Sequence, residues 1–473
     1  MTVAERMREL RGKRCTVIGL GISNLPLVRF LRSHGVALTA RDRKDRAALG
    51  DVADELRALG VPLILGEDYL KDITEDVIFR SPGLRPDLAP LKQAEARGAE
   101  ITSEMELFFS LTPALTVGIT GSDGKTTTTT LTYLLLKTEW EKSGKGRVFV
   151  GGNIGEPLLP RVEEMTARDI AVVELSSFQL FDMKHSPARA AITNLSPNHL
   201  DWHRDLSEYA EAKSHIFRNS QNRMLVTNAK NAAAMELAKQ CSSPVSLFAS
   251  GQPDSAAMAG ASTCVTVEDG WITVRKDGKS ERMLLADDIL LPGVHNLENY
   301  MTAIALTYGM VSKETVKTVA TTFRGVKHRL ELVDVIDGVK YYNSSIDSTP
   351  TRTAAALSAL KEKPIVICGG YDKHIAFAPL AKALKARAKA VVLTGATRDL
   401  IREALDAETG DLDVYTVPVF ADAVAKAREI ASSGDTVLLS PACASFDAFK
   451  NFEERGETFR RIVKDFSKEK ERK

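Results

Sequence analysis

Residues 118–127 read GITGSDGKTT, and this stretch decides how the middle of the chain folds. An apolar run typical of a β-strand precedes it, and the helical sequence TTTLTYLLLK follows it. Glycines allow the backbone to turn its N–H groups toward a phosphate, and the first turn of a helix adds partial positive charge. Lys125 can then reach the terminal phosphates, and the hydroxyl of Thr126 can bind Mg²⁺. The stretch therefore predicts a nucleotide-binding loop, with the variant spacing Gly118-x-x-Gly121-x-x-Gly124-Lys125-Thr126.

Three further polar residues are candidates for the same chemistry. Glu174 ends the strand-like run IAVVE, where an acidic side chain can hold the metal that accompanies a nucleotide. His199 follows the next predicted strand, and Lys213 comes fourteen residues later in a predicted helix. Each of them alone is more often structural, so their assignment depends on the phosphate loop.

Strand-like runs alternate with helical patterns along the chain, which is typical of βαβ units on parallel sheets. We expect three series of strands, at residues 16–21, 36–40, 61–65 and 77–79, then 115–120, 148–150, 170–174, 191–194 and 224–227, then 365–368, 391–394, 414–417 and 436–439. Asp-Gly pairs predict hairpin turns, because both residues tolerate positive φ; they lie at 269–270, 277–278 and 337–338. The first two pairs predict a small antiparallel appendage. With 473 residues and roughly 150 per domain, we expect three α/β domains, at residues 1–112, 113–324 and 325–473.

Composition excludes several classes of function. Lys and Arg number 63 and Asp and Glu 62, so the net charge of +1 offers no positive surplus for nucleic acid or an anionic membrane. Apolar residues make up 44% and charged residues 26%, as in ordinary globular proteins. Five cysteines without a CxxC pair favour a reducing compartment, and neither a signal peptide nor an apolar run of about 20 residues is present. We therefore expect a cytoplasmic protein without nucleic-acid or membrane partners.

A second glycine-bearing loop opens the chain and allows two interpretations. The first predicted strand runs into Gly19-Leu20-Gly21, and Asp42 ends the next strand 21 residues after Gly21. That spacing is close to a dinucleotide fingerprint, which predicts an NAD-dependent enzyme. Asn24 stands where the fingerprint has a third small residue, so the signal for NAD is weak.

Six motifs, in order, resemble the Mur ligase family of ATP-dependent, amide-forming enzymes: TGSDGKT, GGNIG, ELSSFQL, NHLDWH with Lys213, LPGVHNLEN and KHRLE. The resemblance spans nearly the whole chain. It implies a Rossmann-like N-terminal domain that binds a UDP-linked substrate, a central P-loop ATPase-like domain, and a Rossmann-like C-terminal domain that binds an amino acid. The C-terminal stretch LSPACASFDAFKNFEERGETF, with GGYDK, is similar to the branch of the family that adds D-glutamate.

The resemblance implies ATP and two Mg²⁺ ions as cofactors, with catalytic roles for Lys125, His199, Lys213 and Arg329. The implied ATP-binding positions are Gly121, Ser122, Asp123, Gly124, Lys125, Thr126, Thr127, Asn296, Asn299 and Arg329. The implied metal ligands are Thr126, Glu174, His199 and Lys213, the last after its amine has been carbamylated by CO₂.

The same resemblance implies UDP-N-acetylmuramoyl-L-alanine and D-glutamate as substrates of a monomeric ligase. The positions implied for the UDP-linked substrate are Ile22, Ser23, Asp42, Gly83, Asn153 and Gln179. Those implied for D-glutamate are Ser348, Lys373, Ser445, Phe446 and Phe452. Ser344 departs from the family, which usually has an Asp there to contact the ATP ribose, and Asp347 lies three residues further on.

A carboxylate is a poor electrophile, so such a ligase first phosphorylates it with ATP, and the amine then attacks the acyl phosphate. Because the ATP and glutamate residues fall in different domains, we expect the third domain to close over the site. Three alternatives stay open at this point: a sister amide ligase such as a folylpolyglutamate synthase, an NAD-dependent dehydrogenase, and a noncatalytic ATP-gated binding module.

Overall fold

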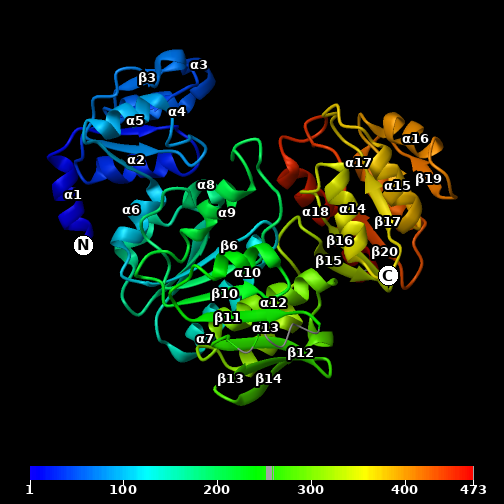
Figure 1. The fold of residues 1–473 in the computed structure, drawn as a ribbon. Helices are drawn as coiled ribbons and strands as arrows, with labels where there is room; N and C mark the ends of the chain where they lie inside the picture. Colours follow the sequence, from blue (N-terminus) through cyan, green and yellow to red (C-terminus); the bar gives the residue numbers. More distant parts are fainter. Residues whose placement is uncertain (252–257, 259, 472–473) are drawn as a thin grey trace. The chain divides into compact units, whose positions relative to one another are not determined.

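The computed structural model describes residues 1–251, 258 and 260–471, and within these residues the strands form three sheets (Figure 1). The chain divides into two compact units. The first unit comprises residues 1–286 and 298–319, and it contains a five-stranded and a nine-stranded sheet. The second comprises residues 287–297 and 320–473, and it contains a six-stranded sheet. The α/β fold is thus confirmed, whereas the domain boundaries at 112/113 and 324/325 stay predictions.

The first sheet is parallel throughout, in the order β3-β2-β1-β4-β5. Its strands are β1 (Cys15–Ile18), β2 (Leu38–Asp42), β3 (Leu63–Leu65), β4 (Val77–Arg80) and β5 (Glu100–Thr102). The helices of this region are α1 (Val3–Arg11), α2 (Asn24–Ser33), α3 (Arg46–Leu49), α4 (Asp51–Ala58), η1 (Gly66–Asp68), α5 (Ala89–Ala96) and α6 (Glu104–Leu111). Asp42 ends β2, as predicted.

The nine-stranded sheet has the order β14-β13-β12-β11-β10-β9-β6-β8-β7. Its strands are β6 (Leu115–Thr120), β7 (Val148–Gly152), β8 (Ile170–Glu174), β9 (Arg189–Ile192), β10 (Met224–Asn228), β11 (Val245–Ala249), β12 (Thr263–Glu268), β13 (Trp271–Lys276) and β14 (Lys279–Leu285). The helices of this region are α7 (Lys125–Ser143), η2 (Leu159–Glu164), α8 (Ser177–Leu180), α9 (Leu206–Ser214), α10 (Ala232–Ala238), η3 (Ala286–Asp288), α12 (Val294–Thr307) and α13 (Lys313–Thr322).

The predicted antiparallel strands β12, β13 and β14 are present, with Asp269 and Asp277 at positive φ in their two turns. They extend the main sheet rather than standing apart from it, because β12 pairs in parallel with β11. Strand β11 itself was not among the predicted strands.

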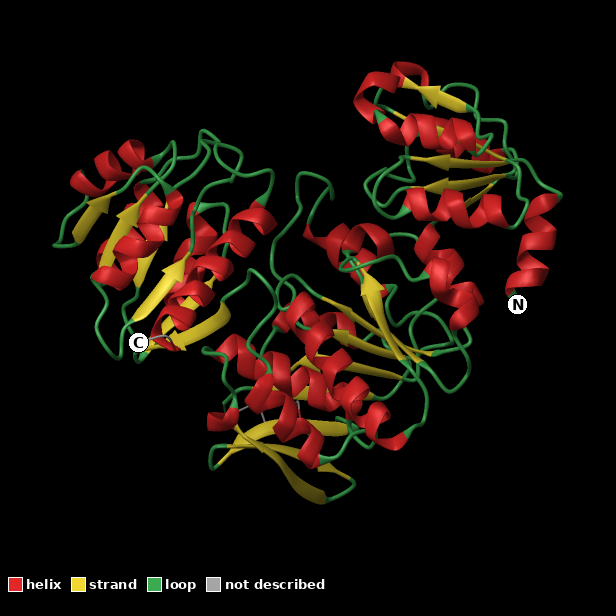
Figure 2. Cartoon of the chain, turned by 180° about the vertical axis from the view of Figure 1, so that it is seen from behind, coloured by secondary structure: helices red, strands yellow, loops and turns green. Residues whose placement is uncertain are grey.

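The six-stranded sheet of the second unit has the order β15-β16-β20-β17-β18-β19, with only β15 antiparallel to its neighbour among the described strands. Its strands are β15 (Glu331–Ile336), β16 (Val339–Asn343), β17 (Ile365–Cys368), β18 (Ala390–Leu393), β19 (Asp413–Thr416) and β20 (Thr436–Leu439). The helices are α14 (Pro350–Ala359), α15 (Ala378–Arg387), α16 (Arg398–Asp406), α17 (Phe420–Glu429) and α18 (Phe452–Glu471). One apolar core joins the sheet to α14, α15 and α16, and a second joins its other face to α17 and α18, so helices cover both sides (Figure 2).

The strand order of the first unit bears on function. Strands β8, β6 and β9 lie side by side and in parallel, so the segments that follow Glu174, Thr120 and Ile192 emerge at one edge of the sheet. Among the described residues, no helix is both long and apolar enough to cross a membrane.

Candidate functional site

The phosphate loop joins β6 to α7, as the sequence predicts. Gly121 has φ 146° and Gly124 has φ 77°, conformations that favour glycine. A Cβ atom at Gly121 would collide with Thr193 Oγ1, and one at Gly124 would lie 2.5 Å from Asn299 Oδ1. Lys125 is the first residue of α7, and its Nζ donates hydrogen bonds of 3.0 Å to the carbonyl oxygens of Gly121 and of Ser122. The ammonium group is therefore held directly over the loop.

Residues after β9, which the sequence did not single out, hold the phosphate loop in place. The backbone N–H of Ser122 donates to the Asn194 carbonyl (2.9 Å), and that of Asp123 donates to Asn194 Oδ1 (3.0 Å). The Ser122 hydroxyl donates to the Ser196 carbonyl (2.9 Å) and lies 3.0 Å from the Tyr209 hydroxyl. These bonds leave the loop little freedom to change its shape.

Glu174 ends β8 and is only 1% exposed. Its Oε1 accepts a 2.8 Å hydrogen bond from the Asn153 amide, and its Oε2 is buried without a hydrogen-bond partner among the described residues. A buried carboxylate oxygen normally accepts a hydrogen bond. An oxygen that serves as a ligand for Mg²⁺ would lack such a bond. Asn153, predicted near the UDP-linked substrate, thus orients Glu174, and its own contact with substrate stays a prediction.

Lys213 lies on α9 and is 1% exposed. Its Nζ donates to Thr120 Oγ1 (3.1 Å) and to the Gly121 carbonyl (2.9 Å), so the predicted lysine does reach the phosphate loop. Burial, and then the positive charge of Lys125, lowers the pKa of Lys213 well below its ordinary value, against the attraction of Glu174 and Asp123. Burial therefore favours the neutral amine over the ammonium form at this position.

His199 belongs to the same group of side chains. Its backbone has φ 56°, and its ring packs against Phe178 with the ring centres 5.0 Å apart. Burial lowers the pKa of His199, and the charges of Lys125 and Lys213 lower it further. The fold thus gathers the predicted residues Lys125, Glu174, His199 and Lys213 at one edge of the sheet.

No three His, Cys, Asp or Glu side chains of the described residues form a cluster that could hold a metal ion. The predicted ligand set includes only two residues of these types, Glu174 and His199, and completes them with the Thr126 hydroxyl and a modified Lys213. The unpartnered oxygen of Glu174 fits such a set.

Gln179 has a local structural role. Its Oε1 accepts a hydrogen bond from Ser176 N (2.9 Å) in a capping box that begins α8, and its contact with the substrate stays a prediction.

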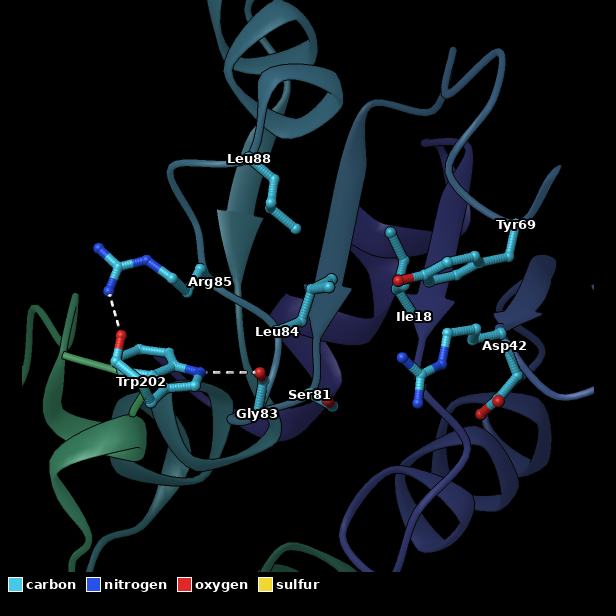
Figure 3. Close-up of a pocket in the computed structure, with 11 residues that line it drawn as sticks. Ile18, Asp42, Tyr69, Ser81, Gly83, Leu84, Arg85, Leu88 and Trp202 are labelled. Atoms are coloured by element: carbon cyan, nitrogen blue, oxygen red, sulfur yellow. Dashed lines mark hydrogen bonds between the residues drawn. The ribbon is translucent and has the colours of Figure 1, made fainter. Parts of the chain in front are cut away.

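A cavity of about 470 Å³ lies at the carboxyl ends of β1, β2 and β4 (Figure 3). Asp42 and Gly83 line it, as expected, whereas Ile22, which is 84% exposed, and Ser23 are not among its lining residues. The carboxylate of Asp42 accepts hydrogen bonds from the backbone of Leu20 (2.6 Å) and of Lys44 (2.8 Å), so it fixes the glycine turn.

Two aromatic rings that the sequence did not indicate lie at opposite ends of this cavity (Figure 3). Tyr69 follows η1, and Trp202 comes from the segment that contains His199. Trp202 Nε1 donates to the Gly83 carbonyl (3.0 Å), and its own carbonyl accepts from Arg85 (2.7 Å). The guanidinium of Arg85 also lies 4.9 Å from the Trp202 ring centre. Hydrogen bonds therefore join the lining of the cavity to the segment that contains His199, a predicted metal ligand.

In the second unit, the structure brings together residues predicted to bind D-glutamate. Lys373 Nζ lies 3.3 Å from the Ser348 hydroxyl and donates to it. Ser445 is buried, and Phe446 is 64% exposed with its ring 5.9 Å from that of Tyr371. The carbonyl of Phe452, at the start of α18, accepts from the hydroxyl of Ser345 (2.8 Å), which belongs to the same segment as Ser348.

Arg455 joins the segments that carry these residues, and sequence reasoning missed it. Its guanidinium donates to the carbonyls of Ser345 (2.9 Å), Cys443 (3.1 Å) and Ala444 (3.0 Å) and to the Ser345 hydroxyl (3.0 Å). Burial lowers the pKa of Arg455 to about 10. The motif NFEERGETF contains this arginine, but only the fold reveals what it contacts.

The remaining predicted ATP residues lie on two elements. Asn299 Oδ1 accepts from the Thr128 hydroxyl (3.1 Å), so α12 contacts α7 just beyond the phosphate loop. Asn296 lies one turn earlier on α12, and its amide donates to the Pro292 carbonyl (2.7 Å). Arg329 belongs to the second unit, in a tight turn between His328 and Leu330, both at positive φ.

Three family models match the chain. They are described as the Mur ligase MurD-like N-terminal domain (residues 13–103), the Mur ligase middle domain (residues 119–307) and the Mur ligase glutamate ligase domain (residues 328–443).

Curated relatives match over nearly the whole length. The UDP-N-acetylmuramoylalanine–D-glutamate ligase of Clostridium novyi is 46% identical over 461 residues, 96% of this chain and 97% of the relative. The chain belongs to the Mur ligase family. The proteins of the same name from Ruminiclostridium cellulolyticum and Clostridium perfringens are each 43% identical, again over 96% of this chain and 97% of the relative.

Solved Mur ligase structures share the fold at much lower identity. The UDP-N-acetylmuramate-alanine ligase of Thermotoga maritima has a TM-score of 0.54 at 19% identity, over 97% of this chain and 100% of that one. A pseudomurein peptide ligase type C from Methanothermus fervidus has a TM-score of 0.52 at 20% identity, over 96% and 99% of the two chains. Both confirm that this Mur ligase has the predicted α/β fold.

Proposed function

We propose that this Mur ligase joins the free carboxylate of UDP-N-acetylmuramoyl-L-alanine to the amine of D-glutamate, with conversion of ATP to ADP and phosphate. One observation carries the proposal. Lys125, Glu174, His199 and Lys213 converge on a glycine-bounded phosphate loop, in a chain 46% identical to a ligase named for this reaction.

The reaction requires two steps that balance in atoms and charge. An oxygen of the L-alanine carboxylate attacks the γ-phosphorus of ATP, and ADP leaves. The D-glutamate nitrogen then attacks the carbonyl carbon of the acyl phosphate, the tetrahedral intermediate expels inorganic phosphate, and the amine loses a proton. Both steps bring anions together, so stabilisation of negative charge is the main task of the protein.

Lys125 supports the first step, because its ammonium group lies over the loop whose backbone N–H groups are proposed to bind phosphate oxygens. Thr126, Glu174, His199 and Lys213 are proposed to hold two Mg²⁺ ions, which supply further positive charge at the phosphates. The phosphate loop and the first residues of α7, from Gly121 to Thr127, are proposed to bind the phosphates of ATP, and Asn296 and Asn299 its adenine. The contact of Arg329 with the phosphates stays a prediction.

The environment of Lys213 supports its proposed carbamylation. Only a neutral amine can attack CO₂, and burial lowers the pKa of Lys213, which favours the neutral form. The nitrogen bonds to the carbon of CO₂ and loses a proton, which leaves an anionic carbamate. A cation that would repel Mg²⁺ thereby becomes an oxygen ligand.

The cavity at β1, β2 and β4 is proposed to hold the uridine diphosphate part of the substrate. Its glycine turns offer backbone N–H groups to phosphates, and Tyr69 and Trp202 offer rings to a flat base. In the second unit, Lys373 is proposed to pair with a carboxylate of D-glutamate, beside Ser348, Ser445, Phe446 and Phe452. A monomeric state and a cytoplasmic location stay predictions.

An assay of ADP formation tests the proposal. The protein is mixed with ATP, Mg²⁺ and UDP-N-acetylmuramoyl-L-alanine, and ADP formation is measured with D-glutamate, L-glutamate, L-alanine, L-lysine and meso-diaminopimelate in turn. We expect turnover with D-glutamate and loss of turnover in Lys125→Ala. Turnover with a different amino acid and none with D-glutamate would instead indicate a sister amide ligase.

A further inference from the structure

Arg85 lines the cavity at the carboxyl ends of β1, β2 and β4, and it also contacts the segment that contains His199. One terminal nitrogen of its guanidinium donates to the Trp202 carbonyl (2.7 Å), and Trp202 Nε1 donates to the Gly83 carbonyl (3.0 Å) (Figure 3). Two hydrogen bonds in opposite directions therefore join the loop 83–85 to Trp202. All of these residues belong to the first unit.

Two carboxylates hold the guanidinium of Arg85 in place. Glu208, in the first turn of α9, accepts from both of its terminal nitrogens (3.0 and 2.8 Å). Asp87 accepts from its Nε (2.9 Å) and from one terminal nitrogen (2.8 Å). These hydrogen bonds hold the pKa of both acids at about 2, so both are ionised at neutral pH. Arg85 therefore bonds α9 directly to the lining of the cavity.

The hydrogen bonds of Arg85 use its whole donor capacity. A guanidinium has five N–H groups, and that of Arg85 makes five hydrogen bonds: one to the Trp202 carbonyl, two to Asp87 and two to Glu208. In the described structure no N–H group is left for a ligand, so Arg85 is placed to hold protein segments together rather than to bind the substrate itself. A lysine, with its N–H groups on one nitrogen, could not span the same three partners.

Helix α9 is also bonded to the phosphate loop. The Tyr209 hydroxyl lies 3.0 Å from Ser122 Oγ, and Lys213 Nζ donates to the Gly121 carbonyl (2.9 Å). Because α9 is one helix of nine residues, Leu206–Ser214, a shift of its first turn displaces its last turn as well. A continuous series of hydrogen bonds thus runs from the cavity lining to the phosphate loop, within the first unit.

We propose that Arg85 is a positioning residue that couples the cavity to the phosphate loop, so that a uridine diphosphate group in the cavity strengthens nucleotide binding at the loop. A ligand against the loop 83–85 and Trp202 favours the arrangement in which the bonds of Arg85 are made, and that arrangement holds α9 against the phosphate loop. Coupling between two binding sites is reciprocal, so the nucleotide strengthens binding in the cavity by the same factor. The inference rests on the proposed function for the identity of the two ligands.

A calorimetric cycle with two ligands tests the coupling. The dissociation constant of ADP with Mg²⁺ is measured with and without saturating UDP-N-acetylmuramoyl-L-alanine, for the unaltered protein and for Arg85→Gln. We expect the substrate to lower this constant about fivefold or more in the unaltered protein and to leave it nearly unchanged in Arg85→Gln. Direct contact between the two ligands would instead give the same ratio in both proteins. The same ratio in both, or no effect of the substrate on the unaltered protein, would overturn the proposal.

Two further variants separate coupling from folding and from charge. Arg85→Lys keeps a positive charge between the two acids, so it should unfold near the temperature of the unaltered protein, yet it should lose the coupling. Arg204→Gln is the matched control, because Arg204 also pairs with Asp87 and Glu208, but its side chain is 69% exposed and it is not among the residues that line the cavity. It should keep the full coupling; loss of coupling there, or coupling that survives in Arg85→Lys, would contradict the proposal. The cycle needs neither D-glutamate nor turnover, so failure of the ligase reaction would be seen separately.

Discussion

Lys213 and Glu104 each place an ionisable group where water does not reach. Burial disfavours the charged form of either residue, so it lowers the pKa of Lys213 and raises the pKa of Glu104 to about 7. Lys213 has hydrogen-bond acceptors and a proposed reaction for its amine. Glu104, at the start of α6, is buried, and its Oε1 has no hydrogen-bond partner among the described residues. The first arrangement is proposed to serve the reaction, and the second is expected to affect stability.

Lys213→Arg should abolish carbamylation, because a guanidinium stays charged and does not react with CO₂. We expect kcat to fall about 100-fold or more, since the loss of a direct metal ligand exceeds the 10- to 100-fold cost of losing its supporting partners. Carbon-13 NMR with labelled bicarbonate should show a carbamate signal in the unaltered protein that is missing from the variant. Lys239→Arg, at an exposed lysine, is the control; an active Lys213→Arg enzyme would exclude an essential ligand role.

Glu104→Gln should stabilise the protein at alkaline pH. Burial raises the pKa of Glu104 from 4.5 to about 7, so the folded state holds a proton that the unfolded state releases between these values. The contribution of Glu104 to stability is therefore complete below pH 4.5, falls as the pH rises toward 7, and is lost above it. The rise of the pKa from 4.5 to about 7 corresponds to about 3 kcal/mol in favour of the variant at pH 8.

The measurement is the difference in unfolding temperature between Glu104→Gln and the unaltered protein at pH 5 and at pH 8. The difference should be larger at pH 8. Glu95→Gln, at an exposed position, should show equal differences at both pH values. A difference for Glu104→Gln that does not grow with pH would show that the carboxyl is not buried as described.

At the scale of elements, the phosphate loop and the strand ends carry most of what the sequence could predict. Apolar runs and Asp-Gly turns are local signals, so β6, β8 and the hairpins of β12 to β14 follow the prediction closely. The predicted strand 191–194 is instead β9 (Arg189–Ile192), because Thr193 and Asn194 leave the sheet to bond the loop. No local signal marks such a contact between segments about 70 residues apart.

Other parts of the site were missed for the same reason. Tyr69, Trp202 and Arg455 act through partners far along the chain, and their surroundings depend on the fold. The capping role of Gln179 does have a local sequence signal, since Ser-x-x-Gln before a helix is typical of a capping box. Residues of the site could be predicted from the sequence where they belong to one continuous loop or one turn.

Gly124→Ala should weaken nucleotide binding, and Gly144→Ala, at the other end of the same helix, provides the matched control. Both glycines have positive φ, at 77° and 61°, so both substitutions cost about 1 kcal/mol in backbone strain. A Cβ at Gly124 would lie 2.5 Å from Asn299 Oδ1, whereas one at Gly144 meets nothing within 4 Å. We expect ADP affinity to fall at least about tenfold in Gly124→Ala only. Equal affinities in a calorimetric titration would show that the loop can relax around the added methyl group.

At the scale of the whole molecule, the residues proposed for the reaction fall in two units. The first contains the phosphate loop and the proposed UDP cavity, and the second contains Lys373 and the residues proposed for D-glutamate. The proposed reaction therefore uses residues of both units.

We expect ligands to close the units on one another. Small-angle X-ray scattering of the protein with ADP, Mg²⁺ and both substrates should give a smaller radius of gyration than the protein alone. Lys125→Ala, which should bind nucleotide poorly, should show a smaller change. Identical scattering curves with and without ligands would count against closure.

The strand β14 forms one rim of the nine-stranded sheet. Its first four residues, Lys279 to Arg282, are charged or polar, and the side chains of Arg282 and Lys279 lie at or near the solvent. A rim strand offers unpaired amides to any passing chain, and charge along it discourages such pairing. The charged edge strand therefore disfavours pairing of this sheet with the same sheet of another copy of the chain.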